Sequence, residues 1–578
     1  MKEKVFNYLK ENYRETAIVT CITIFALIMR LILVQNYGDL WLDELYSWYF
    51  ANQKNVFLTF WELIRQDLHM PLYFIILHFW IKIFGQSDTS MHLCTLTLTL
   101  PLIPISFYTM KFLFNKTTGY FAAIMLAINT FGIYYSVEVR FYGLVFVLSL
   151  LSAFLFVKML EKFDKKYTLA FIVSHSLLIY TFSITPLLTF FYAIVGVIYL
   201  FNRKQECLNS FYKTFGIIFC IALPAAVFTI YNYVVMQSTL CSFTKDIYVF
   251  SWNIIFDILE NFFSSENYQI MTRNINVYRN MFENMQNPYY SMFVAVPVFL
   301  GVLGFIKALF VKNEKLQLFT FPSLLFLLSM LLLGAAGVTS FLTRYATIIY
   351  PVIICTACFG LSQFKIKPVA ITIFALFVGL NYAYLFTPSI NIFTLPRKEL
   401  GNLTYIMNEV VKPSEDDLFL IPYSGSKVMR YIPQGKFIEF NADDALLLKD
   451  KKSRNLYFDR KFYTTLNRQN VKEVLFSYIQ RNAPFELYEF QFKEQYLDKM
   501  QKGQKLILIS YRNAFTMPLL QNWDKVQSGE IYKSLNMFVF LMSKITRDSI
   551  QLCTGYLKFL YEYTDTEGDY SIFVFEKQ

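Results

Sequence analysis

The chain has 578 residues, of which 55% are hydrophobic, 19% aromatic and only 16% charged. Soluble proteins usually carry about a quarter of their residues as charged side chains, so this composition excludes an ordinary soluble protein. The net charge of +11 does not indicate nucleic-acid binding, because most of the excess Lys and Arg lies in short loops between long apolar runs.

Charge in these loops predicts the topology. Lys and Arg residues precede the first apolar run, 17–34, which places the N-terminus in the cytoplasm and makes this run an uncleaved anchor. The segment 71–85 is short for a span, so we interpret it as an interfacial helix on the outer side. With this interpretation every short cytoplasmic loop is basic. About eleven spans follow: 17–34, 91–110, 121–135, 144–157, 169–180, 187–201, 215–235, 292–310, 319–333, 348–361 and 369–385.

The composition changes after about residue 388, where charge rises and the apolar runs shorten. We therefore divide the chain into a membrane domain, 1–390, with outer loops at about 36–89 and 237–289, and an extracytoplasmic domain, 391–578. Strand-like runs alternate with helical patterns, which predicts an α/β domain. The expected strands are 417–421, 505–510 and 570–575, and the expected helices are 399–411, 425–431 and 519–526. These helices lack a Gly-rich phosphate loop, so we predict no nucleotide site there.

Ionisable groups gather on the predicted outer face. Carboxylates there suit a general base, and arginines suit a phosphate, because the guanidinium pairs bidentately and stays charged. Each group alone also fits an ordinary role, as an interfacial loop residue or a side chain that reaches the lipid headgroups. The eight cysteines and four histidines show no zinc-site spacing. The outer-face candidates are Asp43, Glu44, His69, Glu138, Arg140, Tyr142, Arg344 and Tyr345.

Four short motifs in this order resemble those of the GT-C polytopic glycosyltransferases, over residues 15–390. The nearest groups are the protein O-mannosyltransferases, the aminoarabinose–lipid A transferases and the lipopolysaccharide-core galacturonosyltransferases. The first motif is Asp-Glu in the first outer loop, and the second is His-Met-Pro-Leu-Tyr followed by Phe-Gly-Gln-Ser. The third is Ser-Val-Glu-Val-Arg-Phe-Tyr, and the fourth is Arg-Tyr with a later proline. The motifs lie at residues 43–44, 69–73 with 84–87, 136–142, and 344–345 with Pro351.

The resemblance implies a role for each candidate. It implies that Asp43 is the catalytic base, supported by Glu44, and that Arg344 faces the donor phosphate. Arg140 and Tyr345 join Arg344 as donor-binding residues, and His69, Glu138 and Tyr142 line the same pocket. Met70, where relatives have proline, and the turn 181–185 depart from the family pattern. The Trp-Trp-Asp-Tyr-Gly element of oligosaccharide-transferring relatives is absent, which favours transfer of a single sugar.

The predicted function is transfer of one sugar from a polyprenyl-phosphate donor to an extracytoplasmic lipid A, glycan or protein. A lipid-linked sugar flippase or polymerase, and a non-catalytic scaffold, are the alternatives. We expect no obligatory metal, although Asp43, Glu44 and Glu138 could hold a divalent cation. The predicted location is a bacterial inner membrane, crossed many times, with the N-terminus cytoplasmic and the C-terminal domain periplasmic or extracellular.

Overall fold

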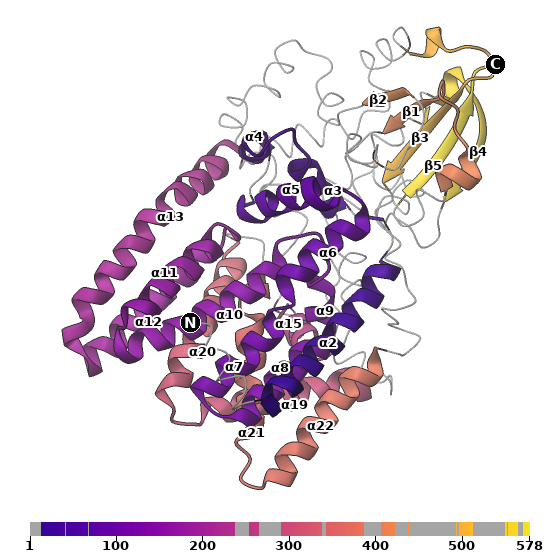
Figure 1. The fold of residues 1–578 in the computed structure, drawn as a ribbon. Coiled ribbons are helices and arrows are strands. Elements are labelled where there is room, and N and C mark those ends of the chain that lie inside the picture. The colour runs from indigo at the N-terminus through magenta and orange to yellow at the C-terminus, as the bar shows by residue number, and fades with distance from the viewer. Residues whose placement is uncertain are drawn as a thin grey trace.

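The structure is a computed structural model with a bundle of apolar helices and, near the C-terminus, a β-sheet (Figure 1). It describes residues 13–37, 39–40, 42–66, 69–236, 252, 254–264, 291–337, 343–385, 406–421, 430, 436–439, 493, 496–511, 550–551, 553–564 and 570–578. Trp41, the predicted domain boundary at 390 and the expected helix 519–526 therefore lie outside the described residues.

The bundle confirms the prediction of a multi-pass membrane protein. In the described part of the chain, seven helical stretches are long and apolar enough to cross a membrane. Each predicted span overlaps a helix, and breaks at Pro101 and Asn129 divide two of them. The bundle helices are α2 (Tyr13–Asn36), α6 (Asp88–Thr99), α7 (Leu102–Leu113), α8 (Lys116–Ile128), α9 (Thr130–Tyr135), α10 (Tyr142–Lys162), α11 (Lys165–Ile179), α12 (Thr185–Arg203), α13 (Leu208–Met236), α19 (Val296–Leu309), α20 (Glu314–Ala335), α21 (Tyr350–Ser362) and α22 (Lys367–Tyr384).

Helix α10 lies at the centre of the bundle, because its apolar residues are distributed around the whole helix. Glycines bring other helices into backbone contact. A Cβ atom on Gly360 of α21 would lie only 1.7 Å from the carbonyl oxygen of Gly304 of α19. Such close approach lets helices pack by van der Waals contact in a lipid environment, where burial of apolar surface between helices contributes little.

Three short helices lie at the end of the bundle that faces the sheet (Figure 1): α3 (Leu42–Ala51), α4 (Val56–Gln66) and α5 (Leu72–Phe84). Helix α5 has 13 residues, about 20 Å, which is too short to cross a hydrocarbon core of about 30 Å. Its first N–H group, on Leu72, donates to the carbonyl of Tyr180 at the end of α11 at 3.0 Å. This length agrees with the predicted interfacial helix.

Basic loops meet at the other end of α10, about 30 Å from its start at 1.5 Å per residue. Glu15 pairs there with Lys111 and Lys116, and Glu161 pairs with Lys158 and Lys315. Side chains from the α7–α8 and α19–α20 turns line one common hollow with the ends of α10 and α12. The loops predicted to be cytoplasmic therefore lie at one end of the bundle.

The described strands form one mixed sheet in the order β2-β1-β3-β5-β4. Strands β2, β1 and β3 are parallel, and β5 is antiparallel to both β3 and β4. The predicted strands 417–421, 505–510 and 570–575 are confirmed as β1, β3 and β5. Of the predicted helix 399–411 the described part is a π-helical turn, Ile406–Val411, and of 425–431 it is Arg430. The strands are β1 (Leu418–Ile421), β2 (Lys436–Glu439), β3 (Lys505–Tyr511), β4 (Lys558–Thr564) and β5 (Tyr570–Glu576).

Candidate active site

An ion pair between Asp43 and Arg344 is the centre of the candidate site. Asp43 lies in the first turn of α3, where a negative charge interacts favourably with the helix dipole. Arg344 lies in a 3-10 helix, η4 (Thr343–Ile348), immediately before α21. The Arg344 Nη1 atom donates to Asp43 Oδ2 at 2.9 Å, and the two side chains are 23% and 26% exposed. The fold thus joins two groups that are 301 positions apart and leaves both accessible to a ligand.

Glu44 is fully buried beside this ion pair. Its Oε1 atom accepts a hydrogen bond from the backbone N–H of Val139 at 2.7 Å, and the ring nitrogen Nδ1 of His92 lies 3.8 Å away. The same nitrogen is 2.8 Å from the carbonyl of Val137, so Nδ1 carries the proton that it donates there. Glu44 therefore holds the 136–140 loop against α3, and this geometry suits a positioning role. Its catalytic assignment stays a prediction.

Arg140 connects three segments of the site. Its Nη1 atom donates to the backbone carbonyl of Asp43 at 3.1 Å and lies 3.4 Å from the hydroxyl of Ser47. Its Nη2 atom is 3.0 Å from Nε2 of His69. Because a guanidinium can only donate, Nε2 of His69 accepts this hydrogen bond. Arg140 is 3% exposed, so its contacts here are to protein acceptors, and its binding to a donor phosphate stays a prediction.

Glu138 is the third carboxylate of the site and is almost completely buried. Burial raises its pKa well above the ordinary value, and the negative charge of Glu44 raises it further, while Arg140 opposes this change. A carboxyl group in this position favours its protonated form.

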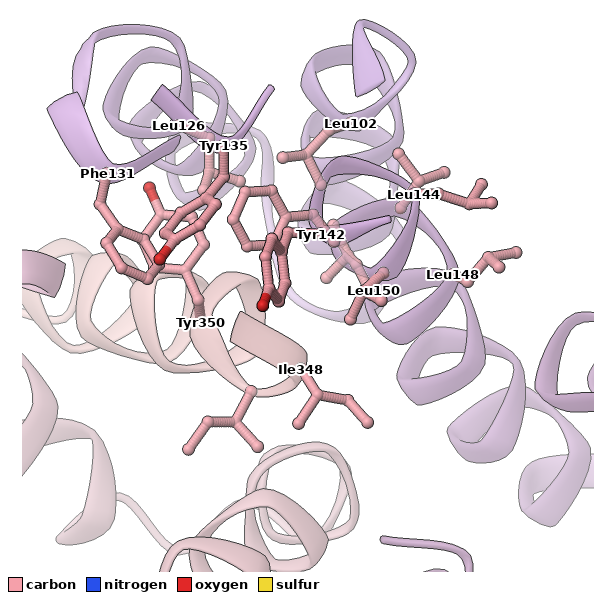
Figure 2. Close-up of a cluster of buried hydrophobic side chains, with 14 of the residues drawn as sticks. Leu102, Leu126, Phe131, Tyr135, Tyr142, Leu144, Leu148, Leu150, Ile348 and Tyr350 are labelled. Carbon is pink, nitrogen blue, oxygen red and sulfur yellow. The ribbon is translucent and has the colours of Figure 1, made fainter. Parts of the chain in front are cut away.

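The two candidate tyrosines are placed less directly in the site. Tyr142 is the first residue of α10 and is 2% exposed. Figure 2 shows its ring in a cluster of buried side chains that includes Tyr135, Leu150 and Ile348. Most of the Tyr142 side chain therefore packs in the hydrophobic core next to the site. Tyr345 is partly buried, with its ring centre 5.9 Å from the guanidinium carbon of Arg344. Their roles in pocket lining and donor binding stay predictions.

A helix that the sequence did not predict packs against the segment that carries Arg344. Helix α15 (Ile254–Phe263) lies within the predicted outer loop 237–289 and contacts η4, α9 and α21. The side-chain amide of Asn129 donates to the carbonyls of Phe262 and Ser264 at 3.1 Å each, and its oxygen accepts from the Tyr350 hydroxyl at 2.8 Å. A buried amide within an apolar run needs such partners. Asn129 was therefore the residue in the sequence that indicated a further element packed against this position.

The carboxylates do not form an evident metal site. In the part of the chain that the structure describes, no three His, Cys, Asp or Glu side chains are grouped closely enough to hold a metal ion. The carboxylate of Asp43 is engaged by an arginine, and that of Glu44 by a backbone N–H group. The absence of an obligatory metal stays a prediction.

Comparisons with known proteins identify the fold. Residues 68–231 match the family of dolichyl-phosphate-mannose-protein mannosyltransferases. No curated protein matches the chain in sequence. The crystal structure of ArnT from Cupriavidus metallidurans in the apo state is similar over 97% of this chain and 98% of its own, with 9% identity and a TM-score of 0.53. The archaeal oligosaccharyltransferase AglB from Archaeoglobus fulgidus, in complex with an inhibitory peptide and a dolichol-phosphate, aligns over 99% of this chain and 75% of its own, with 11% identity and a TM-score of 0.48.

The fold and the family match point to the same group of membrane proteins. The matched region, 68–231, includes His69, Glu138, Arg140 and Tyr142, and the likeness to ArnT extends over nearly the whole chain. Together they confirm the resemblance of this chain to the GT-C polytopic membrane glycosyltransferases.

Proposed function

We propose that the protein transfers a single sugar from a polyprenyl-phosphate donor to an acceptor at the end of the bundle that carries α3. The observation that carries this proposal is the ion pair between Asp43 and Arg344, which sets a carboxylate beside a guanidinium in an accessible position. A donor of this kind lies in the bilayer with its phosphate at the surface, so a site at the end of the helices can reach it.

The chemistry follows from these two groups. The donor phosphate binds Arg344, which stays charged at any working pH and neutralises the leaving group. The phosphate then replaces Asp43 as the partner of Arg344 and leaves the Asp43 carboxylate available as a base. The acceptor oxygen or nitrogen attacks the anomeric carbon, and its proton passes to Asp43. The bond between that carbon and the phosphate oxygen breaks, and polyprenyl phosphate leaves with both electrons.

The other charged groups organise this site. Arg140 holds the backbone of α3 at Asp43, and Glu44 holds the 136–140 loop. We further propose that the end with α3 faces away from the cytoplasm of a bacterial inner membrane. The basic loops at the opposite end support this orientation by the positive-inside rule. The sheet at the end with α3 is then periplasmic or extracellular.

The experiment that tests the function separates transfer from transport. The purified protein is reconstituted in liposomes with synthetic polyprenyl-phosphate sugars and a mixture of lipid A, glycan and peptide acceptors. Release of free polyprenyl phosphate with a glycosylated acceptor supports the proposal. Movement of the intact donor between leaflets without cleavage supports a flippase, and neither reaction with any donor supports a scaffold; either outcome would overturn the proposal.

A further inference from the structure

Arg430, from the connection between β1 and β2, contacts the membrane bundle beside the candidate site. Its Nε atom donates to Asp88 Oδ1 at 3.1 Å, and its Nη2 atom donates to the same oxygen and to the backbone carbonyl of Gln86. Its guanidinium carbon lies 4.8 Å from the ring centre of Trp48 on α3. We propose that this docking contact, made by Arg430 with Trp48, Gln86 and Asp88, positions the base Asp43. The proposal rests on the proposed function for the role of Asp43.

The docking contact is largely shielded from solvent and combines an ion pair, hydrogen bonds and an aromatic contact in one arginine side chain. The Arg430 and Asp88 side chains are only 12% and 20% exposed, so water screens their attraction less than it screens a pair on an open surface. The planar guanidinium stacks on an aromatic ring while its edge donates hydrogen bonds, a combination that lysine cannot reproduce. Trp48 is itself held, because its Nε1 atom donates to the side-chain oxygen of Gln86 at 3.1 Å.

The contact reaches Asp43 through a short, rigid helix. Trp48 and Asp43 both lie on the ten-residue helix α3, five positions apart, or about 7.5 Å along the axis at 1.5 Å per residue. Arg140 holds the first turn of α3 through the carbonyl of Asp43, and Arg430 holds the following turn through Trp48. Glu44 and the contact of the Ala51 carbonyl with His78 also hold α3, so we infer a shift of the Trp48 turn rather than release of the whole helix. Loss of the Arg430 contact then displaces the Asp43 carboxylate relative to Arg344.

The docking contact also explains a motif that the proposed chemistry does not use. Residues 84–87, Phe-Gly-Gln-Ser, form the turn between α5 and α6, and Asp88 begins α6 after the N-cap Ser87. Gly85 adopts a positive φ of 84° in this turn, a conformation that side chains other than glycine rarely adopt. This turn presents the Gln86 carbonyl and the Asp88 carboxylate to one guanidinium. We therefore infer that this turn attaches the C-terminal sheet to the bundle, and that the attached sheet helps to position Asp43.

The test compares two arginine variants of the full-length protein in lipid nanodiscs. Arg430→Ala removes the docking contact. Arg203→Ala is the matched control, because Arg203 forms an ion pair with Glu314 at 2.8 Å near the opposite end of the bundle. The first measurement, amide hydrogen exchange of residues 42–51, needs no activity. Residues 142–162 report whether the bundle stays folded. We expect at least tenfold faster exchange in residues 42–51 for Arg430→Ala only, with residues 142–162 unchanged.

The second measurement is transfer kinetics. A displacement of about 1 Å at a reacting group can lower a rate about 100-fold, so we expect kcat of Arg430→Ala to fall 10- to 100-fold with the KM for donor changed less than threefold. Asp88→Asn, which keeps the acceptor oxygen, should show a smaller change of the same kind. Exchange in residues 42–51 equal to that of Arg203→Ala would overturn the proposal. A wild-type protein without transfer would instead overturn the proposed function and leave the exchange result to decide the docking contact.

Discussion

Replacement of Asp43 by Asn tests the proposed chemistry most directly. Asparagine has the same shape as aspartate but cannot accept a proton at neutral pH, so the substitution removes the base and leaves the packing of α3 in place. The Asp43 and Arg344 side chains are each about one quarter exposed, so the pair is partly buried, and the side-chain oxygen of asparagine can still accept the hydrogen bond from Arg344. We therefore expect little change in thermal unfolding.

The effect on the rate is much larger. General base catalysis contributes about 10²- to 10⁴-fold, which corresponds to about 2.7–5.4 kcal/mol at 1.36 kcal/mol per factor of ten. Donor affinity should stay the same or increase, because Arg344 loses the carboxylate that competes with the donor phosphate. We predict a 100-fold or larger fall in kcat with no loss of donor binding.

The assay measures release of polyprenyl phosphate from a synthetic donor in single-turnover reactions, together with donor binding at equilibrium. Glu314→Gln is the control, because it removes a carboxylate from an exposed ion pair far from the site. Transfer by Asp43→Asn within twofold of the wild-type rate would refute the base assignment. An equal loss of binding and rate would show that Asp43 acts by orienting Arg344.

Four further predictions concern the surroundings of the base. Glu44→Ala should lower the free energy of unfolding by about 1–3 kcal/mol, because a buried N–H group loses its acceptor, and Glu44→Gln should lower it less; thermal unfolding in detergent checks the order. Burial raises the pKa of Glu138 above 4.5, so the folded protein binds this proton more tightly than the unfolded chain, and stability should fall as pH rises from about 4.5 through the raised pKa. Glu138→Gln should remove this part of the slope in unfolding measured across pH, and an unchanged slope would contradict the assignment. Gly360→Ala should abolish most of the folded yield on size-exclusion chromatography, because its Cβ would meet the Gly304 carbonyl, whereas Gly379→Ala, with open space at that position, should not. Chelation with EDTA should leave transfer unchanged, and a loss that magnesium restores would show that a metal is required.

Several features of this protein follow from the sequence by itself, because they depend on local properties of the chain. Apolar runs of spanning length predict helices wherever lipid must surround the backbone, and the predicted spans overlap the helices of the bundle. The short strand runs near 417, 505 and 570 predict β1, β3 and β5. Asp43 could be selected as a site candidate because a charge at a membrane boundary is costly without a partner, and Arg344 because a guanidinium suits a phosphate.

Only the tertiary structure decided which of these groups meet and in what state. The pairing of Asp43 with Arg344, the burial of Glu44 against the 136–140 loop and the contact of Arg430 with Trp48 all join segments that are distant in the chain. Hydrophobic patterns report the face that an element buries, but they do not report its partner. The contacts of a polar side chain depend on where the packed helices bring acceptors and donors together, and for this reason they emerged only from the fold.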